Sequence, residues 1–435
     1  MDQNQALDIL KMGHNVFLTG SPGSGKTFLL NRYIDYLKNH NKAVAITAST
    51  GIAATHMNGI TLHSWSGIGI KDSITDTEVR SLAKRKYLIK RIKATKVLII
   101  DEVSMLKAGQ FDAVEKICRI FKGSFLPFGG IQVICSGDFF QLPPIEKNSD
   151  EINFISDSRA WKELDIKICY LQGQFRHKDN TLSDLLDNIR KNNIEKSKQI
   201  LQSGFNQKGN TENSVYTRLY THNADVDQIN NQELEKIPEK EFVFQMTSTG
   251  PKDIVDSLKK SCLSPETLVL KKGALVMFIK NNFEQGYVNG TQGKVVDFDV
   301  MGMPIIETLN GKKVLVEKSV WNIEDENNFS IAQIRQLPLR LAWAITVHKS
   351  QGMNLDSAQI DLSKCFIKGM GYVALSRLKT FSGLSLIGVN DLALQVNDKA
   401  LKMDNDFKKG SEVVLADFKK LSFNYIGTVQ KKFIS

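Results

Sequence analysis

Cysteine, proline and long apolar runs are all scarce in this chain. The 435 residues include five cysteines and nine prolines, and the cysteines form no CxxC pair and no Cys/His cluster. This spacing argues against a zinc site or a disulfide framework and favours a reducing compartment. No stretch approaches the roughly 18–20 apolar residues that span a bilayer. The first residues lack a basic region followed by an apolar core, so we expect neither a membrane segment nor a secretory signal.

Acidic residues are also outnumbered. The chain has 57 Lys and Arg against 47 Asp and Glu, which gives a formal net charge of +10. An excess of this size suits a polyanionic partner, although plain solubility would explain it too. The length suffices for two or three domains with ample core. A hydrophobic content of 42% is ordinary for a globular protein.

The segment VFLTGSPGSGKTFLL, residues 16–30, has the most specific pattern. An apolar strand runs into a glycine cluster, and Lys26 and Thr27 follow directly. Glycines let backbone N–H groups approach a ligand, and a helix that starts here directs its positive end at an anion. The pattern predicts a phosphate-binding loop for ATP, with Lys26 on the β- and γ-phosphates and Thr27 on Mg²⁺. The other expected nucleotide-binding residues of the loop are Gly20, Gly23, Ser24 and Gly25.

Two more buried strands end in polar residues. KVLIIDE places Asp101 and Glu102 after four apolar residues, where Asp101 is suited to hold Mg²⁺ and Glu102 to activate the attacking water. IQVICSGDFFQLPP places Gln141 after another strand, either as a γ-phosphate sensor or in an ordinary strand-end turn. Strands of this kind indicate an open α/β sheet with ligand groups at its carboxyl edge.

The pattern of elements changes along the chain. Strands and amphipathic helices alternate, except in a strand-rich stretch with Asn-Gly turns that predicts a small antiparallel barrel. Residues Lys84–Lys96 contain seven basic residues and no acid, which fits either a solvated helix face or phosphate contacts. The expected domains are a first lobe at 1–165 with an insertion at about 66–96, a second lobe at 166–266 and 338–395, the barrel at 267–337, and a Lys-rich C-terminal segment at 396–435.

Taken in order, the motifs GSPGSGKT, IIDEVSM, GDFFQLPP, QFR, VHKSQG and GYVALSR resemble those of superfamily-one DNA helicases. The residues of these motifs are most similar to those of the Pif-type helicases, which are related to the RecD branch. The resemblance runs from about Asp2 to about Val389. It implies two RecA-like lobes, a wedge insertion in the first and an SH3-like barrel in the second. It also implies ATP-driven 5′-to-3′ translocation on single-stranded DNA with duplex unwinding.

The resemblance assigns roles that spacing alone leaves open. It implies that Arg176 and Arg377 are arginine fingers, that Gln141 is the γ-phosphate sensor, and that Gly352 belongs to the nucleotide site. An adenine-reading glutamine is expected just before the phosphate loop, where Gln3 fits the distance better than Gln5. His177 stands where the family often has glutamine, which puts in doubt a role for that position.

DNA contacts are also expected from the resemblance. Trp65, Phe139 and Phe140 could stack on bases, although an aromatic residue at a strand end more often belongs to the core. The residues expected to contact DNA are Thr50, Gly51, His63, Thr221, Asn223, Lys280, Asn281, Asn289, Thr346, His348 and Lys349.

The leading interpretation is a monomeric 5′-to-3′ DNA helicase that uses ATP and Mg²⁺ and can dimerise on DNA. Its expected partners are single-stranded and forked DNA or structured DNA such as G-quadruplexes, in replication, repair, recombination or telomere maintenance. Its expected location is a bacterial or phage-like cytoplasm. Two alternatives remain: a DNA-stimulated ATPase subunit of a repair complex, and a single-strand binding module whose ATPase times release.

Overall fold

The computed structural model describes residues 1–57, 59–69, 71–144, 152–173, 175, 180–205, 217–220, 226–282, 284–324 and 330–435. The chain divides into two units. Unit 1 comprises Met1–Arg176, Glu324–Ser330 and Asp398–Ser435, and unit 2 comprises His177–Ile323 and Ile331–Asn397. Among the described residues, no helix is long and apolar enough to cross a membrane.

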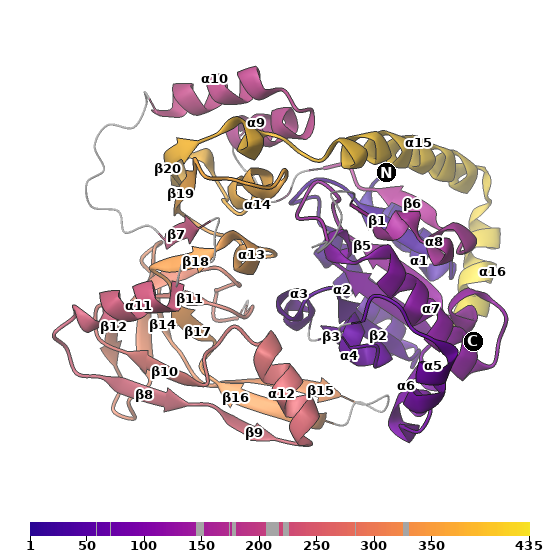
Figure 1. Cartoon of the computed structure of the whole chain (residues 1–435), viewed down its shortest axis with the longest axis horizontal. Coiled ribbons are helices and arrows are strands. Elements are labelled where there is room, and N and C mark those ends of the chain that lie inside the picture. The colour runs from indigo at the N-terminus through magenta and orange to yellow at the C-terminus, as the bar shows by residue number, and fades with distance from the viewer. Residues whose placement is uncertain are drawn as a thin grey trace. The chain divides into compact units, whose positions relative to one another are not determined.

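Unit 1 is built on a parallel six-stranded sheet in the order β3-β2-β4-β5-β1-β6 (Figure 1). Every residue of β1, β4 and β5 is buried, as expected of strands covered on both faces. Since parallel strands end at one edge, the loops after these three strands share that edge. The strands are β1 (Val16–Thr19), β2 (Val44–Ala48), β3 (Ile60–Thr61), β4 (Val97–Asp101), β5 (Gln132–Ser136) and β6 (Lys167–Tyr170).

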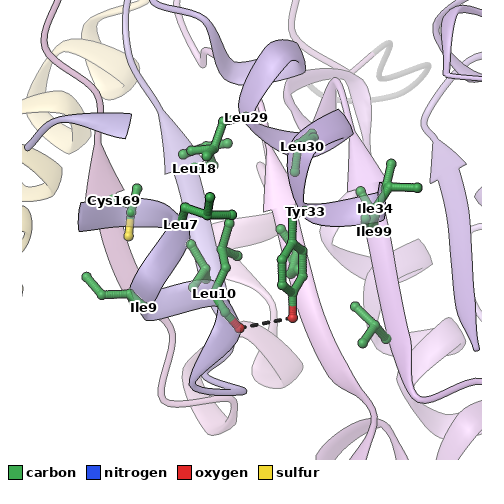
Figure 2. Packing of buried hydrophobic residues seen from close by; sticks show 14 of the residues in the cluster. Leu7, Ile9, Leu10, Leu18, Leu29, Leu30, Tyr33, Ile34, Ile99 and Cys169 are labelled. Carbon is green, nitrogen blue, oxygen red and sulfur yellow. Dashed lines mark hydrogen bonds between the residues drawn. The ribbon is translucent and has the colours of Figure 1, made fainter. Parts of the chain in front are cut away.

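Helices α1 and α2 pack against this sheet through a cluster of leucines and isoleucines (Figure 2). Leu7, Leu10 and Leu30 are buried there. The Tyr33 hydroxyl, buried in the same cluster, donates to the Leu10 carbonyl at 3.0 Å. The helices of the first 176 residues are α1 (Gln3–Lys11), α2 (Lys26–Asn39), α3 (Gly51–His56), α4 (Leu62–Ser66), α5 (Asp76–Leu82), α6 (Lys86–Ala94), α7 (Ala108–Lys122) and α8 (Arg159–Glu163).

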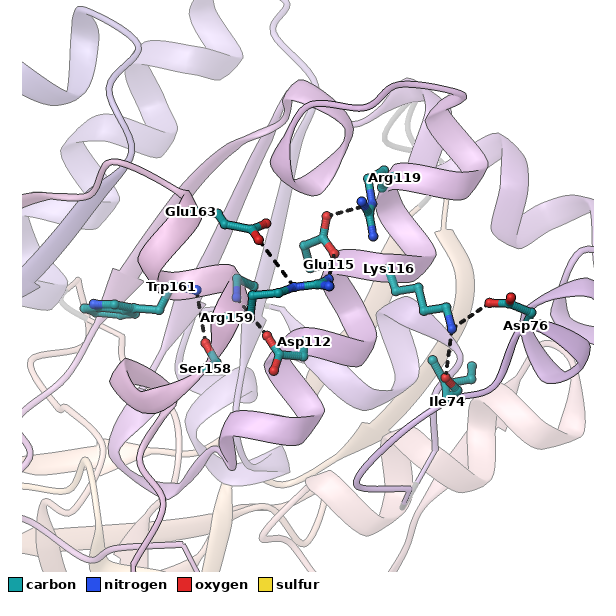
Figure 3. A network of polar contacts seen from close by, with 11 residues as sticks. Ile74, Asp76, Asp112, Glu115, Lys116, Arg119, Ser158, Arg159, Trp161 and Glu163 are labelled. Carbon is teal, nitrogen blue, oxygen red and sulfur yellow. Dashed lines mark hydrogen bonds and ion pairs between the residues drawn. The ribbon is translucent and has the colours of Figure 1, made fainter.

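The insertion after α4 forms two short helices, α5 and α6, and an ion pair joins α5 to α7. Lys116 of α7 pairs with Asp76 at 2.6 Å and donates to the Ile74 carbonyl at 3.3 Å (Figure 3). On α7 the buried carboxylate of Glu115 lies 3.2 Å from Arg119 and 3.5 Å from Arg159. The insertion is therefore held on α7 by the Asp76–Lys116 ion pair, and the buried side chains of α6 add to it.

The C-terminal segment forms two helices, α15 (Asp398–Lys420) and α16 (Phe423–Ile434), that belong to unit 1. Helix α15 packs along β6, the edge strand of the sheet. The Tyr170 N–H of β6 donates to Ser411 Oγ at 3.0 Å, and its hydroxyl donates to Asp404 Oδ1 at 2.9 Å. The final residues thus cover an edge that would otherwise expose unpaired backbone groups.

Unit 2 contains a parallel sheet in the order β18-β7-β19-β20. Its strands are β7 (Thr217–Tyr220), β18 (Ala344–Thr346), β19 (Ala358–Leu362) and β20 (Leu384–Val389). Its helices are α9 (Asn180–Arg190), α10 (Ile194–Phe205), α11 (Val226–Glu235), α13 (Val347–Ser350) and α14 (Met370–Ser376).

In the chain, an antiparallel region is inserted between β7 and β18. The order β14-β13-β12-β11-β17 forms its main sheet, β8 pairs with β10, and β15, β16 and β9 form a third sheet. Antiparallel pairing thus begins at β8, upstream of the start expected at residue 267. The elements are β8 (Phe242–Gln245), β9 (Thr247–Thr249), α12 (Lys252–Ser261), β10 (Thr267–Leu270), β11 (Leu275–Phe278), β12 (Gln292–Phe298), β13 (Pro304–Thr308), β14 (Lys313–Leu315), β15 (Ser319–Glu324), β16 (Ser330–Gln336) and β17 (Leu339–Leu341).

Candidate nucleotide and DNA sites

The loop after β1 has the backbone geometry of an anion cradle. Gly20, Gly23 and Gly25 have φ of 144°, 85° and 86°, a region that L side chains rarely adopt. A Cβ added at Gly20 would lie 2.8 Å from the Leu171 carbonyl oxygen. Gly25 is the N-cap of α2, so the first N–H groups of that helix face the loop. Glycine is therefore required here both by conformation and by space.

Lys26 lies over this loop. Its Nζ donates to the carbonyl oxygens of Gly20 at 2.8 Å and Ser21 at 3.1 Å, so the ammonium stays beside the loop that would wrap a phosphate. Thr27, one residue along, is exposed. The Ser24 hydroxyl is buried without a hydrogen-bond partner among the described residues. The loop therefore holds a cation and polar groups that a polyphosphate would satisfy.

The structure separates the two candidate adenine-reading glutamines. The Gln5 side chain accepts from the Asp2 N–H at 3.0 Å as part of a capping box at the start of α1. The Gln3 side chain instead donates to the Ser24 carbonyl at 3.4 Å, and a Cβ at Gly25 would meet Gln3 Nε2. The contacts favour Gln3, because Gln5 is occupied in capping its own helix.

Phe175 is a residue that the motif analysis passed over. Its N–H donates to the Gly23 carbonyl at 2.8 Å, and a Cβ at Gly25 would lie 3.5 Å from its ring. The ring is 69% exposed, although it sits against the phosphate loop. The aromatic residue directly before the arginine in QFR was the available sequence signal.

Asp101 and Glu102 end β4 at the same edge of the sheet. Burial, and next the adjacent Glu102, raise the pKa of Asp101 to about 6, while Lys26 acts in the opposite direction. Glu102 has φ 52° and ψ 46°, a left-handed conformation uncommon outside glycine. The Ser49 hydroxyl donates to the Glu102 carbonyl at 2.6 Å and helps to hold this turn.

Gln141 follows β5 in a tight turn. Its N–H donates to the Asp138 carbonyl at 3.0 Å. Its side chain is 5% exposed, and Oε1 has no hydrogen-bond partner among the described residues. Because a buried amide oxygen without a partner costs free energy, this geometry suits a side chain awaiting a ligand.

These donors fit Mg²⁺ only together with a nucleotide. Among the described residues, no group of three or more His, Cys, Asp or Glu side chains could hold a metal ion. Mg²⁺ commonly binds one or two protein oxygens with phosphates and water as its other ligands. The Asp101 carboxylate and the Thr27 hydroxyl can supply those protein oxygens. The raised pKa of Asp101 also shows that nearby positive charge does not fully offset its burial.

The two arginine-finger candidates differ in what the structure shows of them. Arg176 lies outside the described residues. Arg377 caps α14 in unit 2 and is 1% exposed. Its Nε donates to the Val373 carbonyl at 3.0 Å, and its Nη2 donates to Ser376 Oγ at 2.7 Å. Gly352, also in unit 2, has φ 79° in the turn after α13.

Several expected DNA contacts in unit 1 lie beside the nucleotide edge. Thr50 precedes α3, and its hydroxyl accepts from the Ala53 N–H at 3.3 Å. Gly51 is the first residue of α3, and His63 lies in α4, where burial lowers its pKa. The aromatic candidates Trp65, Phe139 and Phe140 are all buried, so they form core rather than a stacking surface in this structure.

In unit 2, Thr221 and Asn223 lie outside the described residues. Lys280 donates to the Val320 carbonyl at 2.6 Å and lies over the Trp321 ring. The Asn281 side chain accepts from the N–H of Asn289, whose side chain is buried. These three residues therefore stabilise the barrel itself, and DNA contact by them stays a prediction.

The remaining DNA candidates surround α13. Thr346 is its N-cap, and the hydroxyl accepts from the Lys349 N–H at 3.2 Å. His348 is partly buried, which lowers its pKa. Lys349 is also only partly exposed. Their joint placement on one short helix follows the VHKSQG motif, and their contact with DNA stays a prediction.

Comparison with known proteins decides the family. Residues 2–213 match the description PIF1-like helicase, and residues 253–298 match the 2B domain of the DNA helicase Pif1. A curated relative, the ATP-dependent DNA helicase Pif1 of Psychrobacter sp., is 42% identical over an alignment that covers 100% of this chain and 75% of the relative. This chain belongs to the PIF1-like helicase family. The resemblance seen in the motifs is thereby confirmed.

Other PIF1-like helicases agree over most of the chain. The Bdellovibrio bacteriovorus relative is 36% identical, with 94% of this chain and 92% of the relative covered. The human ATP-dependent DNA helicase PIF1 is 35% identical, and the alignment covers 95% of this chain and 64% of the human protein. The chain thus spans roughly two thirds to nine tenths of these relatives.

Solved structures of PIF1-like helicases confirm the fold class. Bacteroides sp. Pif1 in complex with ADP-AlF4 has a TM-score of 0.79 at 29% identity, covering 94% of this chain and 96% of that chain. Candida albicans Pif1 helicase has a TM-score of 0.73 at 33% identity, covering 93% and 98%. The expectation of two RecA-like α/β lobes with inserted domains is therefore confirmed.

Proposed function

We propose that this chain is an ATP-dependent DNA helicase that moves 5′-to-3′ along single-stranded DNA and separates duplex ahead of it. The family supports the activity. The observation that carries the proposal is the set of groups at one sheet edge of unit 1: the glycine loop, Lys26, the Asp101–Glu102 pair and Gln141. These are the groups that hold and hydrolyse a nucleoside triphosphate.

Each residue has a role in this proposal. Lys26 and the loop N–H groups bind the phosphates, Gln3 reads the adenine, and the Phe175 ring stacks on it. Asp101 and Thr27 hold Mg²⁺, which when bound supplies positive charge to the phosphate oxygens. Glu102 orients and deprotonates the attacking water. Gln141 reports the γ-phosphate, and Arg176 and Arg377 neutralise the charge that develops there.

The partners belong to the same proposal. Bacteroides Pif1 structures include complexes with single-stranded DNA and with forked DNA bound by two coordinating helicases. By analogy, we propose single-stranded and forked DNA as substrates, with G-quadruplexes as a further class, and a monomer that can pair on a fork. The five cysteines are all free thiols, which supports the proposed cytoplasmic location.

Strand separation on three duplexes tests this function. The duplexes carry a 5′ tail, a 3′ tail or blunt ends, and the isolated chain is supplied with ATP and Mg²⁺. We expect unwinding of the 5′-tailed duplex alone, with Lys26→Ala as the inactive control. Unwinding of the 3′-tailed duplex instead would contradict the polarity. DNA-stimulated ATPase without unwinding would favour a subunit of a larger complex, and binding with ATP-timed release would favour a single-strand binding module.

A further inference from the structure

Helix α15 packs a partly buried aromatic side chain, Phe407, against two buried rings of unit 1. The Phe407 ring stacks on Phe139, with centroids 5.7 Å apart and planes at 24°. It also meets Phe17 edge-on at 5.0 Å and 64°. Phe17 and Phe139 contact each other at 5.4 Å, so the three rings form a closed triangle. We call these three residues the ring triangle.

Both partners of Phe407 lie just before nucleotide-site residues in the chain. Phe17 is in β1, three residues before Gly20 of the phosphate loop. Phe139 lies two residues before Gln141, inside the turn that the Asp138–Gln141 hydrogen bond closes. A fourth ring, Phe154, holds Phe139 from another side at 5.0 Å and 70°. The position of Gln141 therefore depends on how the Phe139 ring is packed.

Polar contacts fix the helix that carries Phe407. Asp404 accepts from the Tyr170 hydroxyl at 2.9 Å and pairs with Lys408 at 2.7 Å. Nearer its start, Lys399 Nζ pairs with Asp157 at 2.8 Å. Beyond Phe407, Ser411 Oγ accepts from the Tyr170 N–H at 3.0 Å, so bonds to the rest of unit 1 lie on both sides of Phe407 along the helix. Helix α15 begins directly after Asn397, the last residue of unit 2.

We propose that Phe407 is a positioning residue for ATP hydrolysis, which holds the Gln141 turn in its active place by stacking on Phe139. Phe407 does not touch the nucleotide. It sets the Phe139 ring, which in turn sets the backbone that aims the Gln141 side chain. The proposal rests on the sensor role proposed for Gln141.

Steady-state ATPase with saturating single-stranded DNA tests the proposal. We expect Phe407→Ala to lower kcat about tenfold, because small displacements of a catalytic group cost one to two orders of magnitude in rate. KM for ATP and the affinity for fluorescent ADP should stay within about twofold, since Lys26 and the loop are untouched. Phe407→Tyr keeps the ring and should restore turnover. If the alanine variant does not fold, Phe407→Leu keeps apolar bulk without a ring and replaces it.

A matched control separates positioning from general stability. Phe418 lies on the same helix but packs against the core cluster of α1 and α2, so Phe418→Ala should lower the melting temperature and leave kcat close to wild type. A decrease in kcat equal to that of Phe407→Ala would overturn the proposal, because loss of any α15 ring would then suffice.

A double-mutant cycle with Gln141→Ala gives the decisive readout. If Phe407 acts through Gln141, adding Phe407→Ala to Gln141→Ala should lower kcat no further. Multiplicative effects would overturn the positioning role, as would wild-type kcat in Phe407→Ala beside a slow Gln141→Ala. Wild-type kcat in Gln141→Ala would instead overturn the sensor role of Gln141, and with it the positioning role of Phe407. The proposed strand separation would not be affected by that result.

Discussion

At the scale of single residues, the nucleotide edge of unit 1 has polar groups that are buried without compensation. Ser24 Oγ and Gln141 Oε1 have no partner among the described residues, and burial raises the pKa of Asp101 to about 6. Each feature costs folding free energy in the free protein. Bound nucleotide and Mg²⁺ would satisfy these groups, so function and stability oppose each other at this edge.

Asp101→Asn should therefore stabilise the free protein while abolishing turnover. The folded carboxyl has a pKa of about 6, above the roughly 3.9 of an unfolded chain. Burial of this carboxyl does not lower the free energy of unfolding below pH ~4, where the group is largely protonated. The free energy of unfolding then decreases as the pH rises from ~4 to ~6 and stays at the lower value above that. The variant should gain ~1–3 kcal/mol at pH 7.5, measured by thermal unfolding in EDTA.

The pH series supplies the control for that experiment. The difference between variant and wild type should vanish below pH ~3, where the carboxyl is protonated in both the folded and the unfolded state. Adding Mg²⁺ and ADP should raise the melting temperature of wild type more than that of Asp101→Asn. Equal stability of the two proteins at pH 7.5 without ligand would show that Asp101 carries no burial penalty.

At the scale of elements, α6 joins a buried face to a basic one. Leu88 and Ile92 are buried, whereas Lys84, Arg85 and Lys86 at its start are exposed. None of these three cations forms an ion pair with a described residue. The start of α6 therefore presents positive charge that no described carboxylate neutralises, which suits phosphate contacts, although a solvated helix end has the same appearance.

Changing Lys84, Arg85 and Lys86 together to alanine should weaken fork binding and reduce its salt dependence. Each lost phosphate contact should lower the slope of log K against log salt by about 0.7 on single strands and 0.9 on duplex. The matched control changes three exposed lysines of the C-terminal helices, Lys419, Lys431 and Lys432, to alanine, with the same loss of charge. If the slope does not change in the Lys84, Arg85 and Lys86 variant, α6 is a solvated helix that does not contact phosphates.

The sequence predicted those parts of the site that are local in the chain. Glycine spacing and two strand ends were enough to predict the phosphate loop and the Asp101–Glu102 pair, because neighbours along the chain create that chemistry. The stacking of Phe139 on Phe407 could not be foreseen, because Phe407 lies far along the chain in a segment without a motif. The capping box that occupies Gln5 was readable as Asp2 with Gln5 three residues later.

At the scale of the whole molecule, nucleotide chemistry is proposed to need residues of both units. The phosphate loop, Asp101 and Gln141 belong to unit 1, and Arg377 belongs to unit 2. Within unit 2, Arg377 is held by the Val373 carbonyl and the Ser376 hydroxyl. These two hydrogen bonds use Nε and Nη2 of the guanidinium, and its bonding to phosphate oxygens stays a proposal.

Arg377→Ala should lower DNA-stimulated turnover about 10³-fold, with a modest loss of ATP affinity and nearly unchanged single-strand binding without nucleotide. Arg377→Lys should not rescue turnover, since lysine lacks the planar fork. Arg190, another buried arginine of unit 2 that donates to the Tyr372 hydroxyl at 2.7 Å, offers the control: Arg190→Lys should keep turnover. Persistent turnover with collapsed DNA affinity in Arg377→Ala would make Arg377 a strand contact instead.

The return of the C-terminal helices to unit 1 also governs when that unit can finish folding during synthesis. Ser411 and its bonding partner Tyr170 are 241 residues apart. At about 5–20 residues per second, the ribosome makes the second residue roughly 12–50 s after the first. Throughout that interval β6 is an open sheet edge, and the rings of Phe17 and Phe139 lack their cover. A nascent chain of this helicase therefore completes its second lobe before its first. During this interval the open edge of β6 is the part of unit 1 that a chaperone would shield.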